Sequence, residues 1–129
     1  MIELSEKRIA VTGGAGFLGT AVVKSLLCRG VPRHQIYIPR SSEYNLVNEQ
    51  DVIRMYSDYN PQIVIHLAAE VGGIGANMAQ PGRFFYSNMA MGMHLVEHAR
   101  LCGLEKFIQI PPCRKMVIFI TEFVILTLL

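Results

Sequence analysis

A cluster of four glycines near the N-terminus, in the stretch VTGGAGFLG at residues 11–19, restricts the fold of this chain more than any other feature. Glycine tolerates a positive φ and carries no side chain, so a phosphate group can approach its backbone amides closely. The apolar run Ile9–Val11 precedes the glycines, and apolar residues at helical spacing follow them. This pattern predicts a strand, a glycine turn and a helix, which is the context in which such a turn binds a dinucleotide.

The glycines fit two spacings that are both used to hold dinucleotides. Counted from Gly14 they read G-x-G-x-x-G, and counted from Gly13 they read G-x-x-G-x-x-G. The residues alone leave both spacings open. A third interpretation, in which the glycines only allow the helix to pack tightly on the sheet, stays open as well.

Strands and helices are predicted to alternate along the rest of the chain. Further strands are expected at residues 35–38, 63–69 and 106–110, and helices after the glycine turn, at 48–59 and at 88–102. Such alternation favours a parallel sheet with right-handed crossovers, an α/β fold with helices on both faces. The apolar faces predicted for the three helices are, in chain order, Ala21, Val22, Leu26 and Leu27; Val52, Ile53 and Tyr56; and Met89, Met93, Val96 and Ala99.

Length and charge exclude several classes of protein. A chain of 129 residues is long enough for one domain with a core and too short for two ordinary ones. The net charge of +2 comes without a basic run, so no nucleic-acid partner is expected. Three cysteines without metal-ligand spacing and a charged N-terminus without a signal peptide favour a reduced, cytoplasmic setting and no metal site.

His66 and His94 lie in apolar stretches and are interpreted as core residues.

The residues that follow the second predicted strand favour NADP over NAD. A dinucleotide site usually carries Asp or Glu here to accept the ribose hydroxyls of NAD, whereas an arginine suits the 2′-phosphate of NADP. The sequence is Pro39-Arg40-Ser41-Ser42, and no acid follows until Glu43. Arg40 is therefore the candidate phosphate ligand, with a solvated loop charge as the alternative.

Three longer stretches resemble a known family. TGGAGFLG at 12–19, HLAAEVGGIGAN at 66–77 and FFYSNMAMGMHLVEHAR at 84–100 are similar to the N-terminal half of the GDP-L-fucose synthases. These enzymes are extended short-chain dehydrogenase/reductases of the NAD-dependent epimerase/dehydratase family. The resemblance covers residues 7–110 and implies a Rossmann-like fold that is truncated in this chain. It also implies the spacing T-G-x-x-G-x-x-G, with Gly13, Gly16 and Gly19 as the working glycines and Gly14 as a permissive neighbour.

The resemblance further implies a cofactor, NADP(H), and a set of residues around it. Residues 40–46 would hold the adenosine end, the segment after the third strand would pass the cofactor, and Val71 to Ile74 would lie beside the nicotinamide and the sugar. The implied cofactor-binding residues are Gly13, Gly14, Gly16, Phe17, Leu18, Gly19, Arg40, Ser41, Asn45, Leu46, Ala68, Ala69 and Val71.

The catalytic residues that the resemblance implies are missing from the sequence. The family reduces a 4-keto sugar nucleotide with a Ser, a Tyr and a Lys, the last two four residues apart so that both face the cofactor. None of the five tyrosines is followed by lysine at that spacing. Where the family carries the serine turn, the sequence reads PPCRK at 111–115. Cys113 stands near the position of the family's reactive cysteine, but its neighbours differ.

Residues 111–129 form a divergent hydrophobic tail ending in MVIFITEFVILTLL. A β-prone strand, a short membrane anchor and sequence from a frameshift are the interpretations considered, and the last is favoured because the composition matches nothing earlier in the chain. The tail is too short to span a bilayer as a helix, so no membrane partner is expected. An apolar, β-prone tail after an edge strand predicts self-association.

Two hypotheses follow for residues 1–110 as a partial NAD(P)-binding domain. In the first, the chain is the cofactor-binding portion of an enzyme that converts GDP-4-keto-6-deoxy-mannose to GDP-L-fucose, and it meets the sugar nucleotide only if a C-terminal domain completes it. In the second, it is a non-catalytic nucleotide-binding remnant or truncated product. The missing tyrosine and lysine favour the second for this chain alone.

Overall fold

The computed structural model describes residues 3–110; residues 1–2 and the hydrophobic tail at 111–129 lie outside the described part. One sheet of four parallel strands forms the centre of the molecule, in the order β2-β1-β3-β4. The strands are β1 (Ile9–Thr12), β2 (Ile36–Tyr37), β3 (Ile63–His66) and β4 (Lys106–Gln109).

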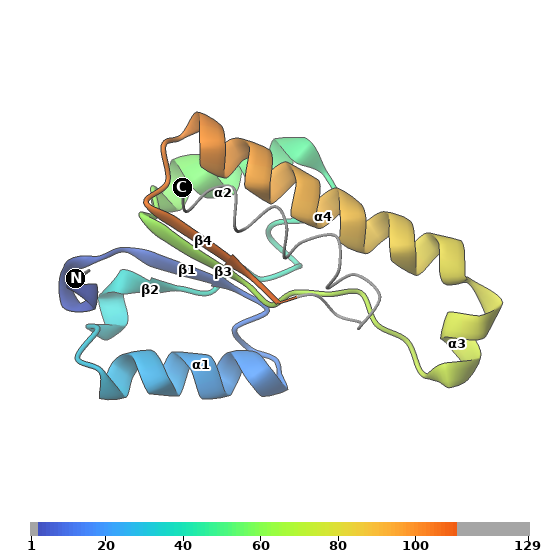
Figure 1. The fold of residues 1–129 in the computed structure, drawn as a ribbon, viewed down its shortest axis with the longest axis horizontal. Coiled ribbons are helices and arrows are strands. Elements are labelled where there is room, and N and C mark those ends of the chain that lie inside the picture. The colour runs from blue at the N-terminus through green and yellow to red at the C-terminus, as the bar shows by residue number, and fades with distance from the viewer. Residues whose placement is uncertain (1–2, 111–129) are drawn as a thin grey trace, which may run out of the picture.

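Helices cover both faces of this sheet. One face carries α1, and the other carries α2 and α4, with α3 leading into α4 at the far end of that helix (Figure 1). The arrangement confirms the Rossmann-like fold class predicted from the sequence. The helices are α1 (Phe17–Cys28), α2 (Glu49–Tyr59), α3 (Ile74–Ala79) and α4 (Pro81–Leu101), and two short 3-10 turns span η1 (Leu4–Glu6) and η2 (Arg33–Gln35).

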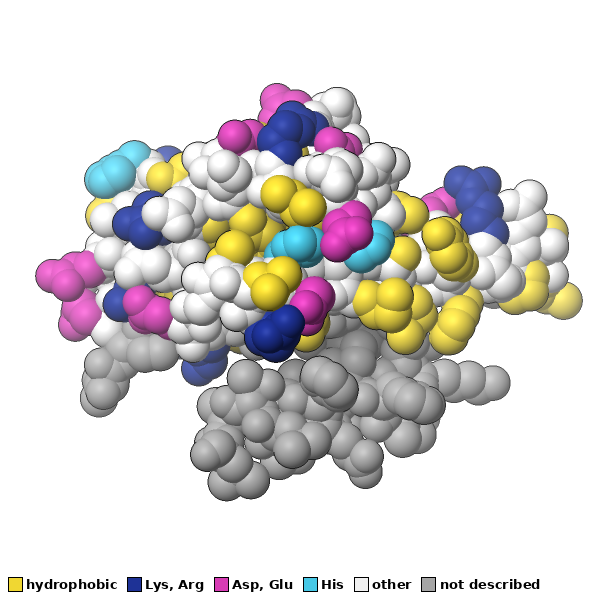
Figure 2. Space-filling model, turned by 90° about the horizontal axis from the view of Figure 1, so that it is seen from above, with side chains coloured by type: hydrophobic (Ala, Val, Ile, Leu, Met, Phe, Trp, Pro, Cys, Tyr) yellow, Lys and Arg dark blue, Asp and Glu magenta, His cyan; other side chains and the backbone are white. Residues whose placement is uncertain are grey.

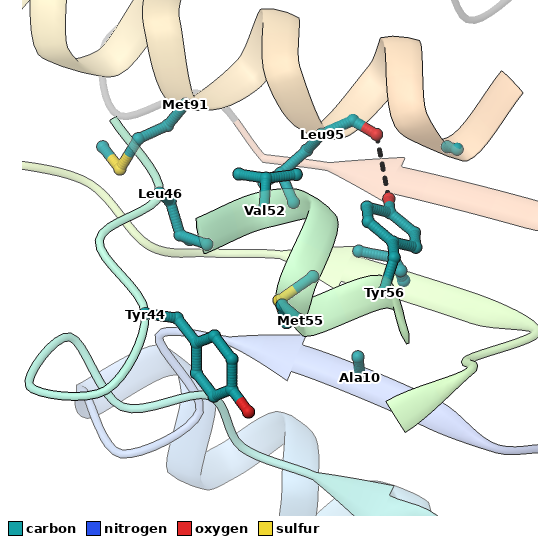
Figure 3. Close-up of a cluster of buried hydrophobic side chains, with 10 residues drawn as sticks. Ala10, Tyr44, Leu46, Val52, Met55, Tyr56, Met91 and Leu95 are labelled. Carbon is teal, nitrogen blue, oxygen red and sulfur yellow. Dashed lines mark hydrogen bonds between the residues drawn. The ribbon is translucent and has the colours of Figure 1, made fainter. Parts of the chain in front are cut away.

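The alternation of side chains along β1 divides the core in two. Ile9 and Val11 point to the α1 side, whereas Ala10 points to the α2 and α4 side. All three are fully buried, as expected for a parallel strand that is covered on both faces. On the α2 and α4 side, the Tyr56 hydroxyl donates a hydrogen bond of 2.8 Å to the Leu95 carbonyl and joins the two helices (Figure 3).

The buried face of α1 differs from the predicted one. Ala21 and Leu27 are exposed, and Val23 is buried with Leu26. The buried side of α1 runs from Gly19 through Val23 to Leu26. Gly19 in the first turn lies directly against the glycine turn, and this contact determines which side of the helix faces the core. Hydrophobicity alone therefore predicted Leu26 and the half-buried Val22, which packs against this core, but it missed Val23.

The same correction applies to α2 and α4. In α2, Met55 is buried and Ile53 remains 39% exposed, because the face toward the core runs through Val52, Met55 and Tyr56. In α4, Met93 is 59% exposed. Hydrophobic side chains gather toward one end of the surface that these helices present (Figure 2).

The start of α4 and the presence of α3 also differ from the prediction. The helix α4 begins at Pro81 rather than Asn88, since proline suits the first helical turn and its missing N–H costs nothing there. The short helix α3 was not predicted, because its glycines indicated a loop. No helix within residues 3–110 is long and apolar enough to cross a membrane.

Candidate functional site

Three connections leave the sheet at one edge. The strands β1, β2 and β3 are parallel neighbours, so their carboxyl ends lie together. The glycine turn follows β1, the segment 38–48 follows β2, and the segment 67–73 follows β3. In open α/β sheets this edge is where ligands bind. All of the predicted cofactor-binding residues lie on these connections or in the first turn of α1.

The glycine turn requires glycine at its first position. Gly13 has a φ of +71°, which side chains rarely tolerate, and a Cβ there would lie 2.7 Å from the backbone nitrogen of Ala68. The turn is closed by a hydrogen bond of 3.0 Å from the Gly16 N–H to the Gly13 carbonyl. The predicted role of Gly13 in shaping the turn thus has a steric basis, and the turn touches the segment after β3.

Gly14 is more than the permissive neighbour that the sequence suggested. A Cβ on Gly14 would lie 2.9 Å from the Val11 carbonyl oxygen and 3.0 Å from the Ile38 side chain. Ile38 follows β2, so Gly14 allows the turn to fit against the neighbouring connection. Gly14 is buried, and its close contacts are with other parts of the protein.

Gly16 differs from the other three glycines because it opens toward solvent. A Cβ there would meet only the Gly13 carbonyl oxygen, at 3.3 Å, and the residue is exposed. It stands at the N-cap of α1, which has no capping side chain and no acid in its first turn. The first N–H groups of a helix have no partner within the helix and carry partial positive charge. This geometry suits an anion, and the absent side chain leaves room for it.

Phe17 and Leu18 frame this opening from the first turn of α1. The Phe17 side chain is fully exposed and that of Leu18 is 45% exposed. Both residues lie in the first turn of α1, beside the helix N-terminus.

A buried polar pair holds the ends of β1 and β3 together beneath the turn. Thr12 Oγ1 lies 2.6 Å from His66 Nδ1 and accepts a hydrogen bond of 3.3 Å from the Ala68 N–H. Thr12 and His66 therefore share a buried hydrogen bond, and the tautomer of the ring decides which of the two donates. Burial lowers the pKa of His66 to about 4, which keeps the ring neutral. His66 is a satisfied core residue, as predicted.

His94, interpreted in the same way, is different. It is half-buried on α4, and its Nδ1 atom is buried without a hydrogen-bond partner among the described residues. The prediction of a satisfied core histidine is therefore wrong for this residue.

Arg40 and Ser41 lie on the exposed turn after β2. The Arg40 carbonyl accepts hydrogen bonds from the N–H groups of Glu43 and Tyr44, and these bonds fix the turn. Within residues 3–110 the Arg40 guanidinium forms no hydrogen bond or ion pair, so its charge is available to a ligand at this edge.

Asn45 and Leu46 lie farther along the same connection, before α2. The Asn45 side chain accepts a hydrogen bond from the Val47 N–H, and the backbone N–H of Asn45 donates one to the Asp51 carboxylate. The Leu46 side chain is 7% exposed and packs in the core with Val52. A cofactor at this edge would therefore meet the backbone of Leu46 rather than its side chain.

The segment after β3, which carries Ala68, Ala69 and Val71, is fastened to α4. Asn88 accepts a hydrogen bond of 2.8 Å from the Glu70 N–H and donates one of 2.9 Å to the Glu70 carbonyl. The Glu70 carboxylate pairs with Arg83 at 2.7 Å. Val71, next in the chain, is 70% exposed. The sequence reasoning missed Asn88, because no local pattern distinguishes it from the other polar residues of α4.

Comparison with known proteins agrees with this geometry. Residues 9–111 match the model of the NAD dependent epimerase/dehydratase family. The chain is 32% identical over 108 residues to the GDP-L-fucose synthase of Sinorhizobium fredii, covering 84% of this chain and 33% of that protein. It is 30% identical to the GDP-L-colitose synthase of Yersinia pseudotuberculosis, covering 80% of this chain and 32% of that protein. The chain spans about a third of the length of these relatives.

Solved structures of similar fold include proteins with a bound dinucleotide. The GDP-mannoheptose C4 reductase MlghC of Campylobacter jejuni, solved with NADP bound, superposes with a TM-score of 0.75 at 27% identity, over 84% of this chain and 33% of that one. A GDP-L-fucose synthetase of Naegleria fowleri bound to NADP gives a TM-score of 0.64 at 29% identity, over 81% of this chain and 31% of that one.

Proposed function

Because the chain belongs to the NAD dependent epimerase/dehydratase family, we propose that it binds NADP(H) at the carboxyl edge of its sheet. The observation that carries this proposal is the opening at Gly16. Three glycines of the turn are explained by contacts within the protein, but Gly16 is exposed at an uncapped helix N-terminus. A pyrophosphate placed there would accept hydrogen bonds from the first N–H groups of α1.

Arg40 supports NADP(H) rather than NAD(H). Its guanidinium is uncommitted within the described residues and stands on the turn after β2, where the ribose of a bound dinucleotide is held in this fold. A charge-assisted hydrogen bond between arginine and the 2′-phosphate contributes about 1.5–3 kcal/mol. The solved relatives with NADP bound support the same choice of cofactor.

The proposed chemical context is a GDP-sugar epimerase and reductase. The relatives are named as GDP-L-fucose and GDP-L-colitose synthases, and the structural neighbours include a GDP-heptose reductase. In the proposed reaction, GDP-4-keto-6-deoxy-mannose is epimerised and reduced to GDP-L-fucose, and bound NADPH supplies the hydride. The glycine turn and Arg40 would hold the cofactor, and the segment after β3 would lie beside it.

A second candidate function rests on the missing catalytic pair. Proton donation to the ketone oxygen requires an acid such as the family's tyrosine, whose pKa a neighbouring lysine lowers. No tyrosine in the 129 residues has a lysine four positions later. A second candidate function of these 129 residues is therefore nucleotide binding without turnover of the sugar.

The cofactor proposal is tested by titrating the 129-residue chain with NADPH and NADH and following the nucleotide fluorescence. We expect tighter binding of NADPH and loss of that preference in Arg40→Asp. Arg29→Asp is the matched control, since Arg29 is an exposed arginine at the opposite end of α1. Equal affinity of the native chain for both nucleotides, or an unchanged preference in Arg40→Asp, would remove the role given to Arg40.

A further inference from the structure

Side chains on one face of α2 contact the exposed turn that carries Arg40. Asp51, Arg54 and Asp58 follow one another at intervals of three and four positions, which places them on the same face of the helix. The Arg54 guanidinium donates one hydrogen bond to the Glu43 carbonyl and another, of 2.8 Å, to the Asp51 carboxylate. Arg54 therefore joins α2 to the backbone of the turn.

Tyr44 anchors the same turn in the core. Residues 40–43 are exposed, whereas Tyr44 is buried among the side chains on the α2 and α4 side of the sheet (Figure 3). Its hydroxyl donates a hydrogen bond of 2.7 Å to the Asp58 carboxylate, and the Arg54 guanidinium lies 4.5 Å from the centre of its ring. A cation above an aromatic ring is attracted by it. Arg54 thus contacts the turn at a backbone carbonyl and at its aromatic anchor.

The two residues that Arg54 contacts are also the two that bind the backbone of Arg40. The N–H groups of Glu43 and Tyr44 donate to the Arg40 carbonyl, at 3.0 Å and 2.9 Å. An exposed turn loses conformational freedom when one of its side chains binds a ligand, and a turn that is already fixed lowers that cost. The contacts of Arg54 therefore position the backbone of Arg40 before a ligand arrives.

We infer that Arg54 is a positioning residue that sets the preference of the chain for NADPH over NADH. It fixes the turn from which Arg40 reaches the 2′-phosphate, while its own guanidinium is engaged by Glu43, Asp51 and the Tyr44 ring. The inference rests on the proposed function, in which Arg40 binds that phosphate. NADH lacks the 2′-phosphate, so the position of Arg40 should matter little for its affinity.

The first experiment measures the Kd of the full chain for NADPH and for NADH by nucleotide fluorescence. Arg54→Met keeps an unbranched apolar stem and removes the guanidinium. We expect it to bind NADPH about fivefold more weakly and NADH within about twofold of the native chain, because only the ligand with the 2′-phosphate uses the fixed turn. Arg54→Lys retains a charged donor and should lose less of the preference. Equal weakening of both nucleotides would indicate a general loss of structure and overturn the inference.

A second experiment separates positioning from direct contact with the ligand. It repeats Arg54→Met in an Arg40→Ala background, in which the proposed phosphate ligand is absent. If Arg54 acts through Arg40, Arg54→Met should then change the affinity for NADPH by less than about twofold. The same loss in both backgrounds would show that Arg54 acts independently of Arg40, and this result would overturn the inference.

Arg100→Met is the matched control. Arg100 is an exposed helical arginine that forms an ion pair of 2.6 Å with Glu97, three positions earlier, as Arg54 does with Asp51. Arg100 belongs to α4 and does not contact the turn, so its replacement should leave the affinities for both nucleotides within about twofold of the native values.

The outcomes distinguish this inference from the proposed function. A native chain that binds both nucleotides equally would contradict the proposed function, and the inference would fail with it. A native preference that survives in Arg54→Met would overturn the inference alone. Hydrogen exchange of the Tyr44 amide, which donates to the Arg40 carbonyl, should be faster in free Arg54→Met than in the free native chain. Unchanged exchange would show that Arg54 does not fix the turn.

Discussion

Gly19 lies against Gly13 so closely that a Cβ on Gly19 would stand 2.0 Å from the Gly13 carbonyl oxygen. The first turn of α1 is thereby pressed onto the glycine turn, and no side chain fits between them. Gly19→Ala should lower the free energy of unfolding by at least about 2 kcal/mol, because the helix must move away from the turn. Urea denaturation measures the loss. Gly75→Ala, at a helical position with open space, should leave stability unchanged or slightly raised.

Gly16→Ala should separate binding from folding. The added methyl group meets only one atom of the protein, at 3.3 Å, so the free energy of unfolding should fall by less than about 1 kcal/mol. The same methyl group occupies the space proposed for the pyrophosphate, so NADPH should bind about tenfold or more weakly. Fluorescence titration and urea denaturation on one preparation give both values. Native affinity in Gly16→Ala would contradict the placement of the pyrophosphate.

The buried His66 should make stability depend on pH. Burial lowers the pKa of His66 from 6.5 to about 4, so between these values the unfolded chain binds a proton that the folded chain does not. The contribution is complete above pH 6.5 and is lost as the pH falls toward 4, by up to about 3 kcal/mol.

Denaturation of the native chain and of His66→Asn across this pH range tests the effect. The asparagine oxygen can still accept from Thr12, but the side chain does not titrate, so the slope should flatten. The exposed His34, changed to asparagine, should keep the native slope. A flat native profile would show that His66 does not carry the dependence.

The chain alone should not reduce a sugar nucleotide. Hydride transfer without a proton donor leaves an alkoxide unstabilised, and loss of general acid catalysis lowers rates by roughly 10²- to 10⁴-fold. Incubation with NADPH and GDP-4-keto-6-deoxy-mannose should leave NADPH oxidation at background. Formation of GDP-L-fucose above the no-protein control would show that another group in the chain donates the proton.

The edge of the sheet at β4 should promote self-association. Ile108 is 36% exposed and, with Leu26 and Ile65, lines a hollow of about 350 Å³ on the α1 face. Within the described residues, β4 pairs with β3 only, and a strand paired on one side is a template for association. Ile108→Lys should raise the monomeric fraction measured by light scattering. Leu101→Lys, at a more exposed apolar position at the end of α4, should have no effect.

The sequence predicted the order of strands and helices well, because the period of the apolar residues changes where the structure changes. Ile9–Val11 and the run beginning at Ile63 are strands as expected. The parallel pairing follows from the helices between them. The faces of the helices were harder to predict, since Val23 and Leu27 are equally apolar and only contact with the sheet distinguishes them.

The glycines of the site could be predicted from the sequence, whereas the residues that pack against them or hold the neighbouring segment could not. Gly13, Gly16 and Gly19 stand out by spacing, whereas the tight fit of Gly14 depends on Ile38 from another strand. The two hydrogen bonds between Asn88 and Glu70 join residues that are 18 positions apart in the chain, and no local sequence pattern indicates them. Contacts of this kind arise from the tertiary fold, and a single sequence does not contain them.

The strand order has a consequence for the way in which the chain folds. Ile9 pairs with both Ile36 and Ile63, and Ile63 also pairs with Lys106. Every ladder of the sheet therefore closes a long loop, and none is a local hairpin. During synthesis the side of β1 that pairs with β3 stays unpaired until β3 has left the ribosome. A chain whose central strands are far apart in the sequence folds slowly for its size. Chaperones would bind the chain during the interval in which β1 is exposed.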